Sequence, residues 1–135
     1  NGWGNNYLKE KRTPPQKVAA QRAQIQEDGL TDFSLNVQRL QSMIDICRQK
    51  KIQVVIVSMP QTRIYEHYLN PKKLNKIIKT CSSLAQKNPG VAYYLNLFAD
   101  KRFNDEDFYD ADHLNDQGAV KSSEIVNNFL QRISK

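Results

Sequence analysis

The stretch "IQVVIVSMP", from Ile52 to Pro60, decides the fold class of this 135-residue chain. An apolar, β-branched run extends from Ile52 to Val57 without the regular polar alternation of a strand that has one face in solvent. A short run of this kind is typical of a buried strand in a parallel sheet. Pro60 ends the strand. Because parallel strands are joined by crossovers, the flanking sequence has to supply a helix and a second strand.

The flanking sequence supplies both elements. A second apolar run, "VAYYLNLF", lies at Val91 to Phe98. An amphipathic helix precedes this run and begins at Asn70 and Pro71. The sequence "NPG", residues 88–90, stops that helix. Three further helices are predicted at residues 14–26, 34–50 and 115–133, with a loop or extended arm at residues 1–15 and a loop at residues 61–71.

The order helix, helix, strand, helix, strand, helix predicts an α/β fold whose parallel strands are joined by right-handed crossovers. With 39% apolar and 25% charged residues, the chain is expected to form one globular domain. Only two strands are predicted, whereas a doubly wound sheet has four or more. We therefore expect the chain either to recruit strands from elsewhere or to be the C-terminal portion of a larger domain. Since it opens at Asn1 without Met, a processed or truncated product is expected.

The net charge of +6 raises the question of nucleic-acid binding. The basic residues are scattered along the sequence, and those at residues 48–51 lie where a helix C-terminus favours cations, so no nucleic-acid partner is predicted. Cys47 and Cys81 occupy apolar helical positions and are expected to be buried free thiols. No apolar run reaches the length of about 18 residues that a membrane span needs.

The segment "DADHLN", residues 110–115, combines two carboxylates with one of the two histidines of the chain. It follows the second predicted strand, and sites of open parallel sheets lie beyond the carboxyl ends of the strands. An Asp three residues before a His can reach the imidazole Nδ1 within one tight turn. The sequence therefore predicts that Asp110 orients His113, as the acid orients the base in a catalytic triad.

The longer segment "FYDADHLNDQGAVKSSEIV", residues 108–126, resembles the last conserved block of the SGNH/GDSL hydrolases, Asp-x-x-His followed by a polar turn, a Gly and a helix. The resemblance extends over residues 37–129 and implies a flavodoxin-like three-layer sandwich with a parallel sheet, here an incomplete SGNH-type domain. It also implies that His113 is the catalytic base and Asp110 its partner, while Asp112 has no role in the motif. Asn115 is expected to cap the final helix.

The nucleophile that this family uses has no counterpart here. The family carries it in a Gly-Asp-Ser block after its first strand, and of the serines in this chain only Ser58 follows a strand, which matches the family's penultimate one. The oxyanion-hole Gly and the Gly-x-Asn block also lack convincing counterparts. Arg63 and Asn115 are the candidates for substrate binding. No cofactor and no metal is predicted, because the consecutive acids Asp105, Glu106 and Asp107 point in different directions.

Three functional hypotheses follow. The first is a serine esterase, acting on a small-molecule or glycan ester such as an acetylated glycan, whose nucleophile lies outside this segment. The resemblance is strongest to bacterial cell-envelope members, including those related to polysaccharide O-acetylation, which implies a cell-envelope or periplasmic location. The second is a non-catalytic module of the same fold that binds a glycan or protein. The third, nucleic-acid binding, would need a continuous basic face.

Overall fold

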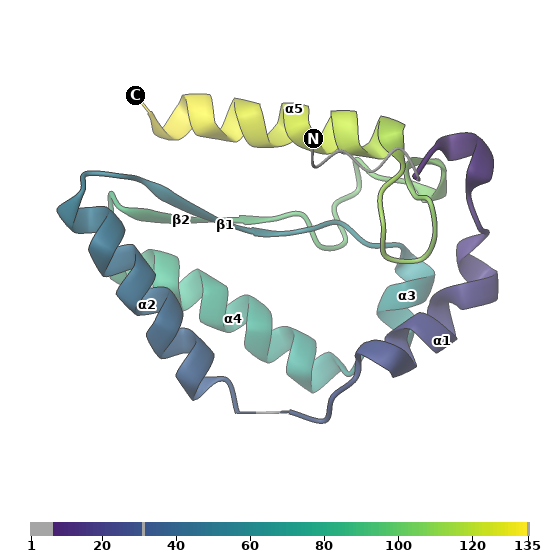
Figure 1. Ribbon diagram of the computed structural model, residues 1–135, viewed down its shortest axis with the longest axis horizontal. Helices are drawn as coiled ribbons and strands as arrows, with labels where there is room; N and C mark the ends of the chain where they lie inside the picture. Colours follow the sequence, from purple (N-terminus) through teal and green to yellow (C-terminus); the bar gives the residue numbers. More distant parts are fainter. Residues whose placement is uncertain (1–6, 31, 135) are drawn as a thin grey trace. The chain divides into compact units, whose positions relative to one another are not determined.

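The computed structural model describes residues 7–30 and 32–134 (Figure 1). Its helices are α1 (Pro15–Gln26), α2 (Ser34–Gln49), α3 (Arg63–Tyr68), α4 (Pro71–Lys87) and α5 (Asp116–Ile133). Its strands are β1 (Val54–Ser58) and β2 (Ala92–Asn96), and two short 3₁₀ helices are η1 (Lys9–Lys11) and η2 (Asp105–Asp107). The chain forms two compact units. Unit 1 holds residues up to 27, 59–69 and those from 97 onward, and unit 2 holds residues 28–58 and 70–96.

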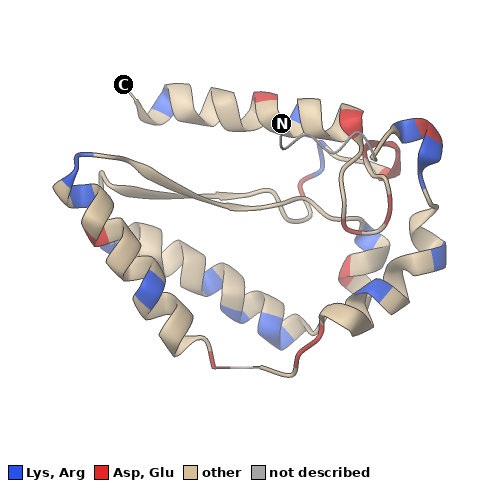
Figure 2. Ribbon diagram, viewed as in Figure 1, with Lys and Arg blue, Asp and Glu red and all other residues tan. Residues whose placement is uncertain are grey.

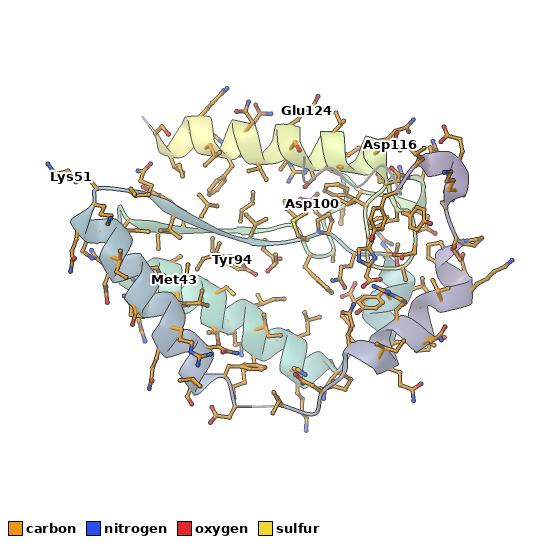
Figure 3. The ribbon with its side chains drawn as sticks, in the orientation of Figure 1. Met43, Lys51, Tyr94, Asp100, Asp116 and Glu124 are labelled. Atoms are coloured by element: carbon orange, nitrogen blue, oxygen red, sulfur yellow. The ribbon has the colours of Figure 1, made fainter. Side chains whose placement is uncertain are left out.

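Unit 2 contains the sheet. Strands β1 and β2 pair in parallel from Val54 opposite Ala92 to Ser58 opposite Asn96, which confirms the predicted strand–helix–strand order. Within this unit α2 and α4 cover one face of the sheet, and the side chain of Tyr94 lies on that face (Figures 1 and 3). The core between helices and sheet is formed by Ile44, Leu84 and Ala92, with Val37, Val54, Ile56 and Val91 packed around them.

Unit 1 is built from α1, α3, α5 and the loop that precedes α5. Helix α1 presents Ala19 and Ala23, four residues apart, to the buried ring of Tyr65 in α3, and Ala111 completes this core. The small alanine side chains allow the two helices to approach closely, since no longer side chain separates their backbones. The core of unit 1 therefore contains a residue of the loop that carries the candidate site.

One sequence prediction in unit 1 is wrong. Residues 61–71 were expected to form a loop, but Arg63 to Tyr68 form α3. Thr62 caps this helix, because its side-chain oxygen accepts a hydrogen bond from the Tyr65 backbone N–H at 3.4 Å. A helix of six residues is too short to display a 3.6-residue apolar repeat, so the sequence pattern gave no sign of it.

The coarse fold class, mixed α/β with parallel strands, is confirmed, and the described part of the chain contains two strands. Both strands are shorter than predicted. Strand β1 begins only at Val54, because Lys51 takes a positive φ of 57° and the Ile52 N–H bonds back to the Cys47 carbonyl of α2. Cys47 and Cys81 are free thiols, half-buried rather than fully buried. Among the described residues, no helix has the length and apolarity needed to traverse a bilayer.

Candidate functional site

The segment Asp110–Asn115 is fixed at both of its ends. An isolated bridge pairs Phe108 with Leu114, and the Tyr109 N–H donates to the His113 carbonyl at 2.8 Å. These bonds close the chain into a tight loop just before α5. The backbone that carries Asp110 and His113 is thus held by local hydrogen bonds.

Asn115 anchors this loop to α5. Its Oδ1 accepts from the Gly118 N–H at 2.9 Å, which confirms the predicted helix cap. Its Nδ2 donates to the Glu106 carbonyl at 2.7 Å, and the residue has no exposed surface. Both ends of the Asn115 amide are thus engaged inside the protein, which gives the residue a structural role in this loop, while its substrate-binding role stays a prediction.

Gly118 lets the loop pack against the first turn of α5. A Cβ atom at this position would lie 2.0 Å from the carbonyl oxygen of Asp107, which is far inside van der Waals contact. That same carbonyl accepts a hydrogen bond from the Asn115 N–H at 3.0 Å. The Gly of the sequence motif is thus required by a close backbone approach.

Asp110 and His113 are brought together as predicted. The imidazole Nδ1 lies 3.0 Å from Oδ1 and 3.1 Å from Oδ2 of the Asp110 carboxylate. The carboxylate is held in place, because Oδ1 also accepts from the backbone N–H groups of Asp112 at 3.1 Å and His113 at 2.9 Å. The His113 side chain remains partly exposed, at 39%.

The proton on the imidazole is assigned to Nδ1 from these distances. Arg22 Nη2 also lies 3.3 Å from Nδ1, but it already donates to Asp112 Oδ2 at 2.9 Å. Both Asp110 oxygens are closer to Nδ1 than the guanidinium is, and a carboxylate can only accept. With the hydrogen on Nδ1, the other ring nitrogen, Nε2, is a free acceptor, which is the form that a general base requires.

Asp112 has a structural partner that the sequence did not reveal. The guanidinium of Arg22, in α1, donates two hydrogen bonds to the Asp112 carboxylate, from Nε to Oδ1 at 2.8 Å and from Nη2 to Oδ2 at 2.9 Å. Gln26 Nε2 also donates to Oδ2, at 2.7 Å. Burial raises the pKa of the Asp112 carboxyl, but the hydrogen bonds from Arg22 and Gln26 and the nearby charges of His113 and Arg22 outweigh it, so the net pKa is lowered. Asp112 therefore has a structural role in holding the loop, and its lack of a role in the catalytic motif stays a prediction.

Helix α3 holds the opposite side of the same loop. The Thr62 hydroxyl donates to the Ala111 carbonyl at 2.7 Å, and Thr62 is 2% exposed. The Tyr65 hydroxyl donates to Gln26 at 2.7 Å, which in turn holds Asp112. Residues of α1 and the cap of α3 therefore hold the loop in place, although they precede it by 49 to 90 positions in the sequence. The sequence around Arg22 and Thr62 contains no motif from which their contacts with this loop could be predicted.

A pocket of about 340 Å³ adjoins the Asp–His pair. His113 and Asp112 line it, together with Met59, Pro60, Leu114, Ala119, Ser122 and Ser123. The Ser123 hydroxyl donates to the Ala119 carbonyl at 2.8 Å within α5. No serine in the described part of the chain forms a hydrogen bond with His113. The pocket is thus lined by an imidazole that the carboxylate of Asp110 orients, and no described serine is hydrogen-bonded to that imidazole.

Arg63 lies in a different pocket. It lines a cavity of about 360 Å³ with Thr62, Asp100, Asn104 and Phe108, and His113 is not among the lining residues. The structure therefore does not bring Arg63 to the pocket beside His113.

Two carboxylates and an imidazole lie close together in this loop, which is a combination that can bind a metal ion. One ligand atom each of Asp110, Asp112 and His113 lies within 4.8 Å of the others. Both Asp112 oxygens already accept hydrogen bonds from Arg22, whose positive charge repels a cation. Earlier in the same loop, the Asp107 carboxylate is paired with Lys121 Nζ at 2.6 Å. The donor set around His113 therefore suits an oriented imidazole better than a bound metal.

The fold and the site define a mixed α/β protein with an acid-oriented histidine in the loop before its last helix. A family model of an uncharacterised family matches residues 15–135, from the first residue of α1 onward, and the chain belongs to that family. No curated protein and no solved structure matches the chain.

Proposed function

We propose that Asp110 and His113 are the acid and base of an ester hydrolase or acyl transferase of the SGNH type, whose attacking serine is supplied by polypeptide outside these 135 residues. The observation that carries the proposal is the contact of His113 Nδ1 with both oxygens of Asp110 beside a pocket. This contact orients the ring and leaves Nε2 available to a substrate or a nucleophile.

The chemistry follows from that arrangement. His113 Nε2 removes the proton of the serine hydroxyl while the serine oxygen bonds to the ester carbonyl carbon. The imidazolium then protonates the departing alcohol oxygen as the ester C–O bond breaks. Water, deprotonated by the same nitrogen, releases the acid and restores the serine. Asp110 stabilises the imidazolium in each step by its negative charge.

The residues around Asp110 and His113 support the proposed role of the pair. Arg22 neutralises Asp112, so a single uncompensated carboxylate, that of Asp110, faces the imidazole. The two parallel strands and their crossover helix suit a flavodoxin-like sandwich that further strands would complete. The resemblance of residues 108–126 favours an ester on a glycan as the substrate, in the cell envelope or periplasm.

The decisive experiment uses the natural protein that contains this chain. Acetate release from an O-acetylated oligosaccharide should fall by a factor of about 10² or more in His113→Ala and in Asp110→Asn, since general base catalysis contributes that much. His67→Ala is the matched control, because His67 lies on α3 and does not line the pocket, and it should leave the rate unchanged. Unchanged rates in all three variants would refute the proposal.

The second candidate is a non-catalytic module that binds a glycan or protein in the same pocket. The observation that favours it is that no described serine hydrogen-bonds to His113. The two candidates differ in the natural protein: a module binds an acetylated oligosaccharide and releases no acetate. For the 135-residue chain alone both predict no turnover, and turnover that His113→Ala abolishes would contradict both.

A further inference from the structure

The charge of the chain is concentrated in one unit. Unit 2 carries nine Lys and Arg against three Asp and Glu, whereas the remainder of the sequence carries eleven of each. The whole formal charge of +6 therefore belongs to unit 2. Residues that are scattered in the sequence are thus gathered by the fold, because α2 and α4 both belong to this unit.

Helix α4 contributes most of this charge. Lys72, Lys76, Lys79 and Lys87 recur at spacings of three, four and eight residues, which places them along one side of the helix. No acidic residue occurs in α4, and Figure 2 shows basic segments along the helix without acidic ones. Lys72 also lies in the first turn, where the helix dipole disfavours a cation. The helix dipole therefore favours Lys87, in the last turn, but does not account for Lys72, Lys76 or Lys79.

The lysine stripe lines a groove of about 600 Å³ within unit 2. All four lysines border it, together with Thr80 and Ser83 of α4 and Val37 of α2. Within the described residues, Lys72, Lys79 and Lys87 form no ion pair. Lys76 lies 5.4 Å from the ring of Phe33. The groove thus combines three lysines that form no ion pair among the described residues with a fourth, Lys76, whose charge interacts with the Asp32 carboxylate.

We propose that this groove binds a linear chain of phosphate groups that carries no aromatic bases. Lys72 and Lys87 are about 22 Å apart along the helix axis, at roughly 1.5 Å per residue, so the stripe matches an extended polyanion. Lysine contacts phosphate as a point charge, and hydroxyls add hydrogen bonds. Nucleobases are instead held by aromatic rings and Arg side chains, and neither lines the groove.

Inorganic polyphosphate is the probe that tests this site. Wild-type protein should bind it with a dependence of log affinity on log salt concentration of about −3, since four phosphate contacts each contribute about −0.7. The triple variant Lys72→Gln/Lys76→Gln/Lys79→Gln should lose at least about tenfold in affinity and should shift that slope to about −1. Titration calorimetry over a salt series measures both quantities, and circular dichroism checks that the variant folds.

The matched control removes the same charge from the same unit outside the groove. The variant Arg39→Gln/Lys50→Gln/Lys51→Gln changes three exposed residues that do not line the groove and should bind polyphosphate within about threefold of wild type. Equal losses in the two variants, or no binding by wild type, would overturn the proposal. Tighter binding of polyglutamate, oligothymidylate or phosphatidylglycerol vesicles than of polyphosphate would overturn the assigned ligand class.

Discussion

His113 Nδ1 lies 3.0 Å from Oδ1 and 3.1 Å from Oδ2 of Asp110, the residue three positions before it. The same carboxylate accepts the His113 backbone N–H at 2.9 Å. The pair is therefore made within one turn of the chain and needs no distant element to bring its members together. Distant elements determine instead how the turn is held, through Arg22 and Thr62.

The first prediction concerns the tautomer of His113. Because Nδ1 donates to Asp110, the neutral ring should carry its hydrogen on Nδ1, and Asp110→Ala should shift it toward the Nε2–H form. Long-range nitrogen–proton NMR spectra distinguish the two tautomers. His67 is the internal control, since its ring has no carboxylate partner among the described residues. An Nε2–H tautomer for His113 in the wild-type protein would contradict the assigned geometry.

The second prediction concerns the clamp on Asp112. Arg22→Ala leaves a carboxylate that is only 5% exposed without its guanidinium partner, so the free energy of unfolding should fall by about 1–3 kcal/mol, between the values for exposed and buried pairs. Urea denaturation measures the change. Arg102→Ala is the control. The Arg102 side chain is 54% exposed, so its ion pair with Asp100 should contribute less than about 1 kcal/mol to the free energy of unfolding. Equal losses would refute a special role for Arg22.

The third prediction is the pH dependence that the same pair produces. The pKa of Asp112 is lowered in the folded protein, so its stabilisation is present above the unfolded-state pKa of about 3.9 and is lost as the pH falls through the folded-state pKa. Wild type should therefore lose more stability between about pH 5 and pH 2 than Asp112→Asn does. Thermal melts across that range measure the difference, and parallel curves would show that Asp112 is not the group responsible.

The sequence predicted the features that neighbouring residues create. The Asp110–His113 contact and the Asn115 cap each need only a few consecutive residues, and the apolar run at Ile52 predicted the parallel strand. The role of Asp112 was not predictable, because Arg22 lies 90 positions away and no local pattern connects the two. Helix α3 was missed for a different reason, since its caps and one buried ring decide its structure rather than a periodic pattern.

The fourth prediction compares two helix caps. Asn115→Ala removes the cap of α5 and also the hydrogen bond to the Glu106 carbonyl, inside a site with no solvent to replace it. The expected loss in the free energy of unfolding is about 2–4 kcal/mol, from the cap and from the other hydrogen bonds of a fully buried amide. Asn70→Ala removes the exposed cap of α4 and should cost about 1 kcal/mol. Similar losses at the two sites would mean that Asn115 acts as a cap alone.

The last prediction concerns Gly118, where a Cβ atom would lie 2.0 Å from the Asp107 carbonyl oxygen and 3.0 Å from the Leu114 side chain. Because the nearer atom belongs to the backbone, Gly118→Ala can be accommodated only by moving the loop away from α5. We expect a loss of about 1–3 kcal/mol or more in the free energy of unfolding, although alanine favours helices. Val120→Ala, at a 60% exposed position of the same helix, should change the stability by less than about 0.5 kcal/mol. The displaced loop carries His113, so Gly118→Ala should also alter the His113 NMR signals, and unchanged stability and spectra would show that the close approach is absent in solution.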